Sequence, residues 1–192
     1  MKKRILTCML SAAFFLHSYC QEYLSPENYS LFRAVVNQDT NSSGRAYYFC
    51  TRGAAFTNET VYLINFLDRE YFSRYLAEKG IPLSFDTLFT EEDLKDMQAV
   101  CRKYEKAVPA WDKRMLAKKE IPVYDDLRKK FRPSMTALYY HAGIPLYTRD
   151  RQHALVYVES VCNGSCDHGS VFIFSRKSGN WKRMAEIVIW TS

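Results

Sequence analysis

Glycine and proline are scarce in this chain, which has seven Gly and six Pro among its 192 residues. Contents this low exclude a collagen-like chain and a low-complexity tail. The motifs GxGxxG, GxxxxGK(S/T), GxSxG and HExxH are also missing, and with them the common signatures of nucleotide-binding proteins, serine hydrolases and zinc proteases. Apolar residues make up 47 % and aromatic residues 15 % of the chain, which indicates a folded domain rather than disorder.

Long hydrophobic runs are missing after residue 20, so the sequence predicts no membrane span. The first twenty residues are typical of a secretory signal peptide, because Lys2, Lys3 and Arg4 precede an apolar run over 5–16 and a more polar end. That run has about twelve residues, whereas a spanning helix needs roughly 20. We therefore expect residues 1–20 to be a signal peptide and residues 21–192 to form one domain that is secreted or periplasmic, in a bacterial context.

The end of this leader allows two processing routes. Ser18 and Cys20 are small residues at positions −3 and −1 of a cut at the Cys20–Gln21 bond, and we favour this cut. The alternative is a cut before Cys20, which would leave that residue lipidated and the protein anchored to a membrane. His17 and Tyr19 weaken the alternative, because they stand where a lipoprotein peptidase prefers leucine and a small residue.

The positive charge of the chain belongs in part to the leader. The formal charge of +6 falls to +3 when Lys2, Lys3 and Arg4 are removed. A charge of this size does not indicate a nucleic-acid partner. A basic cluster over 128–132 is compatible with an acidic partner, but we interpret it as a solvated surface balanced by the neighbouring Asp125 and Asp126.

Cysteines occur at positions 8, 20, 50, 101, 162 and 166, and the expected cut removes the first two. Four remain in a chain bound for an oxidising compartment, so we expect two disulfides. Cys162 and Cys166 flank the turn-forming triplet 163–165, which favours their pairing. Cys50 then pairs with Cys101, closing a loop of about fifty residues that contributes roughly 3–4 kcal/mol.

Two other interpretations of the second cysteine pair stay open. Cys162, Cys166 and His168 lie close together in the sequence and have the chemistry of zinc ligands. A second paired ligand set is missing, however, so we expect neither a metal nor a cofactor. The third interpretation is a reactive Cys166 beside His168, which export into an oxidising compartment disfavours.

Helical patterns dominate the first half of the mature chain. Residues 25–27 read Ser-Pro-Glu, which predicts a helix start, and this helix is expected to end near Asn37. An apolar stripe predicts a second helix over 68–79. The clearest helix starts at Thr90, with acidic residues in its first turn. Its apolar residues recur at three- and four-residue steps, which predicts a buried face of Leu94, Met97, Cys101, Tyr104 and Val108.

Strand patterns dominate the C-terminal region. Short apolar runs over 145–148, 154–158, 170–174 and 181–190 are separated by short polar turns. Strands joined by such short turns are antiparallel neighbours. Together with an earlier strand over 46–50, this pattern predicts an α+β fold in which N-terminal helices pack on one face of a C-terminal antiparallel β-meander.

Residues 144–181 follow a recurring order. A strand begins at Ile144-Pro145, and its elements then come in this sequence: a charged turn at Asp150, the strand Ala154 to Val158, a Cys162-to-Cys166 loop with Gly169, the aromatic strand Phe172 to Phe174, and Gly179-Asn180-Trp181. The order resembles a type of uncharacterised secreted bacterial protein, although Asn163 and Asp167 stand where that type often has glycine. The resemblance covers roughly a quarter of the chain; it implies an exported protein and supplies no catalytic residue.

The best polar cluster is Asp167-His168-Gly169, and we take Asp167 and His168 as candidate ligand-binding residues on the loop that the expected Cys162–Cys166 bridge would hold. His141 is expected near a helix end, with its ring hydrogen-bonded. No catalytic residue is assigned.

Aromatic residues either line a sugar or peptide cleft or fill the core, and strand alternation favours the core for most of them: Tyr47, Tyr48, Tyr139, Tyr140, Tyr147, Tyr157, Trp181 and Trp190.

Two functions from different classes are compatible with these features. We favour an exported non-enzymatic domain that binds a ligand or an envelope partner, because catalytic signatures are missing. The alternative is a small secreted hydrolase that uses scattered acidic and histidine side chains. A cleft with a carboxylate or histidine of perturbed pKa beside a second polar group would favour the hydrolase.

Overall fold

The computed structural model describes residues 25–43, 46–54, 67–104, 110–117, 122–125, 137–162 and 167–192. The leader over 1–20, its Cys20, the end of the Thr90 helix at Val108, the basic cluster over 128–132 and Cys166 lie outside the described residues, so the expectations about them stay predictions.

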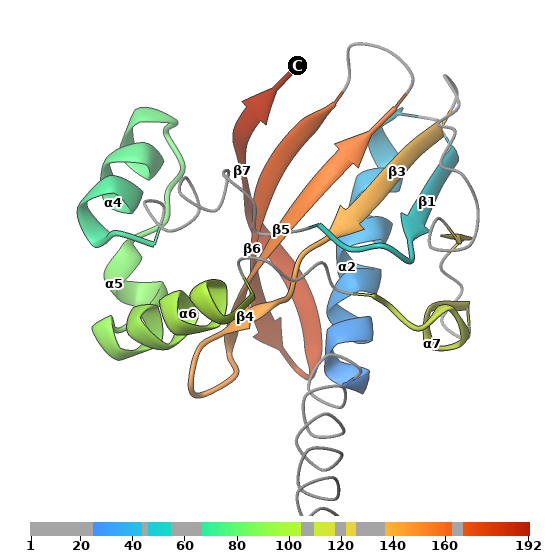
Figure 1. The fold of residues 1–192 in the computed structure, drawn as a ribbon. Coiled ribbons are helices and arrows are strands. Elements are labelled where there is room, and N and C mark those ends of the chain that lie inside the picture. The colour runs from blue at the N-terminus through green and yellow to red at the C-terminus, as the bar shows by residue number, and fades with distance from the viewer. Residues whose placement is uncertain are drawn as a thin grey trace, which may run out of the picture.

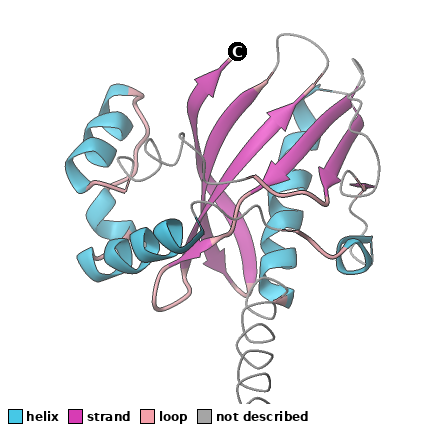
Figure 2. Cartoon of the chain, viewed as in Figure 1, coloured by secondary structure: helices cyan, strands magenta, loops and turns pink. Residues whose placement is uncertain are grey.

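Helices and strands follow the order that the sequence predicts, with most helices before most strands. The helices are α2 (Pro26–Ser43), α4 (Arg69–Glu78), α5 (Phe85–Leu88), α6 (Glu91–Tyr104) and α7 (Lys113–Ala117). The strands are β1 (Ala46–Cys50), β2 (Val123–Tyr124), β3 (Ala137–Ala142), β4 (Leu146–Tyr147), β5 (His153–Val161), β6 (His168–Lys177) and β7 (Asn180–Thr191). Figure 2 shows these strands in a single sheet with helices around it. The α+β class is confirmed.

The sheet has seven strands in the order β2-β1-β3-β5-β6-β7, and β4 pairs with β5. The pairs β4–β5, β5–β6 and β6–β7 are antiparallel, which confirms the predicted meander. On the other side of β5 the sheet continues through β3, which is antiparallel to β5. Strand β1 is parallel to both β3 and β2. The complete sheet is therefore mixed. Parallel neighbours require a long connection, and the chain between β1 and β3 provides one.

Helices lie on both faces of this sheet (Figure 1). Phe32 of α2 contacts Phe49 of β1 with ring centroids 5.0 Å apart. Phe49 pairs with Tyr140 of β3, and Tyr140 pairs with Ser160 of β5. Because paired residues project from the same face of a sheet, Phe49 and Ser160 lie on one face. Phe89, just before α6, contacts His153 of β5. His153 and Ser160 are an odd number of positions apart on one strand, so they project from opposite faces. The expectation that the helices share one face is therefore wrong: α2 covers one face and the segment before α6 contacts the other.

His141 lies on a strand and not at a helix end. It belongs to β3, and its ring Nδ1 is 2.9 Å from the backbone oxygen of Arg52. The expected hydrogen bond is present, but the expected helix is wrong. Strand β3 pairs with both β1 and β5 and is buried along most of its length, so its sequence lacks the alternation that identifies a half-buried strand.

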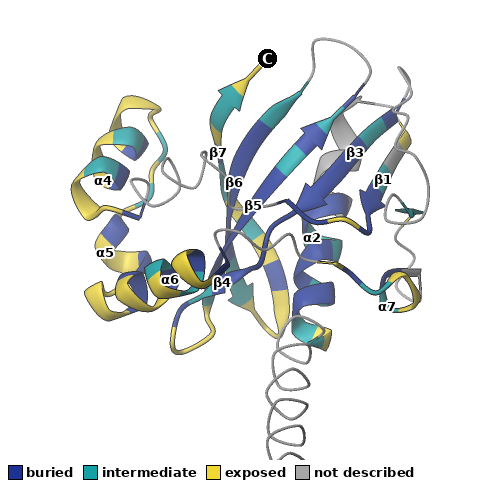
Figure 3. Cartoon of the chain, viewed as in Figure 1, coloured by how far each residue is buried: buried dark blue, intermediate teal, exposed yellow. Residues whose placement is uncertain are grey.

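The predicted inner face of α6 is confirmed. Leu94, Met97, Cys101 and Tyr104 are buried in the main core, while the outward residues of this helix are exposed (Figure 3). Thr90 and Asp93 form a reciprocal cap at the start of α6: the Asp93 N–H donates to the Thr90 hydroxyl over 3.1 Å, and the Thr90 N–H donates to the Asp93 carboxylate over 2.9 Å. This arrangement satisfies two backbone donors that the helix itself leaves unpaired.

The predicted Cys50–Cys101 bridge is not formed in the structure. Cys101 is a buried free cysteine in the main core. Cys50 belongs to a second, smaller cluster with Ala137 and Tyr139. Helix α6 contacts β4, whereas Cys50 ends β1, next to the edge strand β2 (Figure 1). Helical spacing correctly placed Cys101 inward, but the two cysteines lie in different parts of the core.

Candidate functional site

A cavity of about 460 Å³ opens where α2, α6 and the segment 144–151 meet. We call it the α2–α6 cavity. Its apolar walls come from α6 and from the segment around β4: Val100, Tyr104, Ile144, Pro145 and Tyr147. Its polar lining comes from the start of α2 and from the turn after β4: Ser25, Asn28 and Thr148. Its charged lining consists of Asp96, Lys103, Arg149 and Arg151.

The β4–β5 turn that carries two of these arginines is held by its own side chains. The Thr148 hydroxyl donates to Asp150 over 2.7 Å, and Asp150 also accepts a hydrogen bond from the Gln152 N–H. These bonds lower the pKa of the Asp150 carboxyl. The His153 N–H donates back to the Thr148 hydroxyl. Arg151 adopts a φ of 58°, a left-handed conformation that costs energy for a residue with a side chain. The hydrogen bonds of the turn compensate for this cost and hold the Arg151 backbone at the cavity.

Helix α6 is joined to the same turn by two acidic residues. The buried Asp93 accepts a hydrogen bond from the Arg149 N–H over 2.8 Å. Burial raises the pKa of Asp93, but this bond and those from Thr90 outweigh burial, so the pKa lies below its usual value. On the surface, Asp96 receives Arg149 Nε over 2.6 Å and Nη2 over 3.2 Å, and this bidentate contact lowers the pKa of Asp96. Both carboxylates are therefore ionised at neutral pH.

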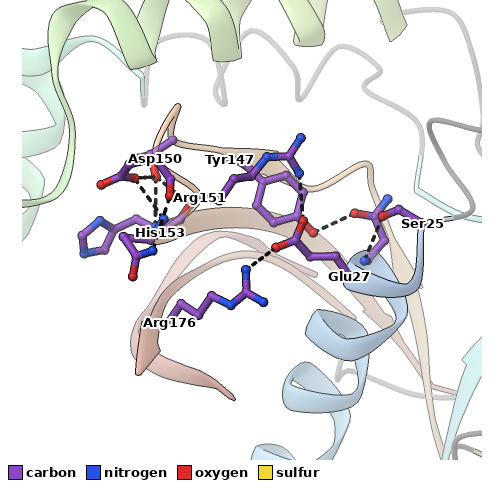
Figure 4. A network of polar contacts seen from close by, with 10 residues as sticks. Ser25, Glu27, Tyr147, Asp150, Arg151, His153 and Arg176 are labelled. Atoms are coloured by element: carbon purple, nitrogen blue, oxygen red, sulfur yellow. Dashed lines mark hydrogen bonds and ion pairs between the residues drawn. The ribbon is translucent and has the colours of Figure 1, made fainter. Parts of the chain in front are cut away.

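Glu27 in the first turn of α2 connects two arginines at the other side of the cavity. Its carboxylate lies 2.9 Å from Arg151 Nη1 and 2.8 Å from Arg176 Nη1. The Arg151 guanidinium also lies over the Tyr147 ring, 4.7 Å from its centroid. Figure 4 shows Arg151, Tyr147, Glu27 and Arg176 as one connected group. The two guanidinium groups share a single carboxylate, so this group carries an excess positive charge.

Tyr147 and Asn28 close the inner end of this group. The Tyr147 hydroxyl donates to Asn28 Oδ1 over 2.7 Å, and Asn28 itself is buried. Burial, and then the Glu27 charge, raise the pKa of Tyr147, so the phenol stays protonated and keeps donating. The Tyr147 ring also contacts Trp181, whose ring Arg176 covers from 5.6 Å. The Tyr147 side chain is therefore held by contacts on several sides.

No protein-family model matches the chain, and neither a curated protein nor a solved structure is significantly similar to it. The resemblance of residues 144–181 to secreted bacterial proteins therefore stays a prediction. Among the described residues, no helix is long and apolar enough to cross a membrane.

The predicted ligand residues Asp167 and His168 lie away from the α2–α6 cavity. Asp167 Oδ1 accepts a hydrogen bond from the Cys162 N–H over 2.8 Å, and the Asp167 backbone oxygen accepts one from the Ser192 N–H. His168 begins β6, with Nε2 3.9 Å from Glu186 Oε1. The Asp167 carboxylate thus orders the backbone beside Cys162, and these two residues do not join the cavity's lining.

The chemistry of Cys162 favours a bridge over a metal. Cys162 is disulfide-bonded, and the other half of this bridge lies outside the described residues, so its pairing with Cys166 stays a prediction. A bridged sulfur is not a thiolate ligand for zinc. Within the described ranges, no cluster of three or more His, Cys, Asp or Glu side chains could hold a metal ion.

Four of the eight aromatic residues of the predicted set, Tyr139, Tyr140, Tyr157 and Trp181, are buried in the core. Tyr139 and Tyr140 are consecutive and both buried, because β3 is buried along most of its length and does not follow the expected alternation. Among the described side chains of the predicted aromatic set, Tyr147 alone lines the α2–α6 cavity. The remaining lining could not be predicted from the sequence, because its residues come from three segments that are far apart along the chain. The sequence identifies the charged turn over 149–151 between two strands, but it does not indicate that Arg149 and Arg151 line a cavity.

Proposed function

We propose that this chain is an exported, non-enzymatic domain that binds a small organic ligand in the α2–α6 cavity. The observation that supports the proposal is the composition of the cavity wall. Five apolar or aromatic residues line the cavity together with seven polar or charged residues. Small-molecule sites combine apolar walls with polar groups that orient the ligand, and they have volumes of about 300–1,000 Å³. The turn that holds Arg149 and Arg151 is ordered by its own hydrogen bonds, so the site is preformed.

The charged groups of the cavity support binding over hydrolysis. A hydrolase needs an acid or base whose pKa is shifted toward neutrality. Asp96 is instead held ionised by Arg149. The described histidines, His141, His153 and His168, are not among the lining residues. The arrangement therefore favours recognition of a ligand, and no observation of the described residues favours the hydrolase alternative.

Export is the part of the proposal that rests on the leader over 1–20. N-terminal sequencing of the protein recovered from a host with a secretory pathway tests it. We expect a mature start at Gln21. A fatty-acylated Cys20 would replace a free secreted form with a lipoprotein, and an intact Met1 would contradict export by either route.

Ligand binding is tested by a variant that fills the cavity. Val100 lines the α2–α6 cavity from α6, so Val100→Trp places an indole in the binding space. Small molecules released from the natively purified wild type and from this variant are compared by untargeted mass spectrometry. We expect at least one compound that the wild type retains and Val100→Trp does not. Val100→Phe, a smaller filler, serves if the first variant unfolds.

Lys95→Gln is the matched control for this comparison. Lys95 is exposed on α6 and lies outside the lining, so its variant should retain the same compounds as the wild type. Equal retention by the wild type and by a folded cavity-filling variant would overturn the proposed function.

A further inference from the structure

We infer that the α2–α6 cavity selects a carboxylate attached to a small apolar body, and that Arg151 is the residue that pairs with this carboxylate. The inference rests on the proposed function, because it assigns the chemistry of the ligand that this cavity takes. It depends on three features of the described residues: the different pairing of two neighbouring arginines, the charge of the group around Glu27, and the position of the apolar walls.

Arg149 and Arg151 both line the cavity but differ in how their donors are used. Arg149 directs Nε and Nη2 to the two oxygens of Asp96. This is the geometry in which a guanidinium saturates one carboxylate. Arg151 directs only Nη1 to Glu27 and places its plane over the Tyr147 ring. Its remaining N–H groups form the edge that a second carboxylate can approach in a bidentate way.

The charges around Arg151 favour an added anion. Arg151 and Arg176 share the Glu27 carboxylate, so one of the two positive charges has no counter-charge within this group. The nearest further acid in the turn, Asp150, is engaged by the Thr148 hydroxyl and the Gln152 N–H. A ligand carboxylate at Arg151 would balance the group, and the cation–π contact with the Tyr147 ring would hold the guanidinium in place.

The apolar walls set the rest of the ligand. Val100 and Tyr104 come from α6, and Ile144 and Pro145 come from the segment before β4. These residues give one part of the lining an apolar surface, while the Arg151 side chain is 55 % exposed. A ligand whose charge lies at one end and whose body is apolar matches this division. Two sources carry this chemistry: a free organic acid and the C-terminal carboxylate of a peptide that ends in an apolar residue.

Four probes test the inference by calorimetry or by NMR titration of the mature protein. Phenylacetate represents the free acid and N-acetylphenylalanine represents the peptide end; phenylacetamide and N-acetylphenylalanine amide are their uncharged partners. We expect at least one acid to bind, and to bind about tenfold or more tightly than its amide, because charge-assisted hydrogen bonds to arginine are roughly twice as strong as neutral ones. Which acid binds more tightly identifies the source.

Variants assign the carboxylate to Arg151. Arg151→Gln should weaken the affinity for the acid about tenfold or more and change the affinity for the amide by no more than about twofold. Arg151→Lys should have an intermediate affinity for the acid, because lysine keeps the charge but lacks the planar fork. Lys95→Gln, which removes a positive charge outside the cavity, should change neither. Glu27→Gln should tighten acid binding, because it removes the internal carboxylate that competes for Arg151.

The two proposals fail in different ways. If an acid and its amide bind with equal affinity, and Val100→Trp abolishes the binding of both, the carboxylate inference is overturned but the cavity remains a binding site. Acid binding that Arg151→Gln leaves unchanged would overturn the role of Arg151. If none of the probes binds, the carboxylate inference is overturned, while retention of uncharged compounds that Val100→Trp abolishes would still support the proposed function.

Discussion

The Asp93 carboxylate, in the first turn of α6, accepts a hydrogen bond from the backbone N–H of Arg149 over 2.8 Å. The same side chain caps its own helix through Thr90. A single buried acid thus connects the start of α6 to the β4–β5 turn, 56 residues further along the chain. Both elements line the α2–α6 cavity, so this bond joins two of its walls.

Replacing Asp93 should destabilise the protein in a pH-dependent way. Asp93→Asn removes the charged acceptor of the Thr90 and Arg149 N–H groups. It is expected to lower the free energy of unfolding by about 1–3 kcal/mol at pH 7. Because the folded-state pKa of Asp93 is lowered, its ionised form stabilises the fold above the unfolded pKa of about 3.9, and this contribution is lost as the pH falls through the folded-state pKa. Urea denaturation at pH 7 and pH 3 should therefore show a smaller difference between variant and wild type at pH 3.

Asp86→Asn is the control for this measurement. Asp86 forms an ion pair with Arg69 in which both side chains are more than half exposed, so its loss should cost under about 1 kcal/mol. A cost of Asp93→Asn as small as that of Asp86→Asn at pH 7 would contradict the capping and bridging role of Asp93.

Gly169 is expected to tolerate no side chain, because the Trp190 indole lies directly over it. A Cβ at position 169 would overlap Nε1 of Trp190 and lie 2.6 Å from its Cε2. The indole is fixed there by a 3.0 Å hydrogen bond from Nε1 to the Tyr157 hydroxyl. Gly169→Ala should lower the free energy of unfolding by about 1–3 kcal/mol, because it overpacks this site. In a Trp190→Ala background the same substitution should cost clearly less, and equal costs in both backgrounds would sink this explanation.

The buried face of α6 makes a direct prediction at Met97, which is 1 % exposed. Met97→Ala should lower the free energy of unfolding by about 2–4 kcal/mol, because it removes buried apolar volume and leaves a cavity. Lys95→Ala, on the exposed side of the same helix, should change stability by no more than about 0.5 kcal/mol. Similar small effects for both variants would show that Met97 is not packed in the core.

The cysteines should behave differently from one another in solution. Burial raises the pKa of the Cys101 thiol to about 12, so this thiol stays protonated at pH 8 and should react with iodoacetamide only after unfolding. Non-reducing peptide mapping should show Cys162 in a disulfide, with Cys166 as the expected partner, and no peptide that joins Cys50 to Cys101. Recovery of a Cys50–Cys101 peptide would contradict the fold, and free Cys162 with bound zinc would revive the metal site.

Local pattern alone determined α6 and the C-terminal strands. The three- and four-residue steps from Leu94 to Tyr104 correctly identified the buried face of α6. The short strands and polar turns after Ile144 correctly identified β4 to β7 as antiparallel neighbours. In α6 one face contacts the core and the other contacts water, so the period of apolar residues records the structure directly. Strands β5 and β6 are buried along most of their length, and they were recognisable as short apolar runs bounded by polar turns.

Tertiary structure decided the features that depend on distant segments. Strand β3 is buried on both sides between β1 and β5, so its residues, His141 among them, carry no periodic signal. The Cys50–Cys101 pairing followed from elimination alone, whereas a disulfide requires Cα atoms within about 7 Å. Cys101 of α6 and Cys50 of β1 lie in separate clusters of the core. The α2–α6 cavity combines α2, α6 and the turn around Arg151; a sequence records each residue type there, whereas only folding brings these charges and walls together.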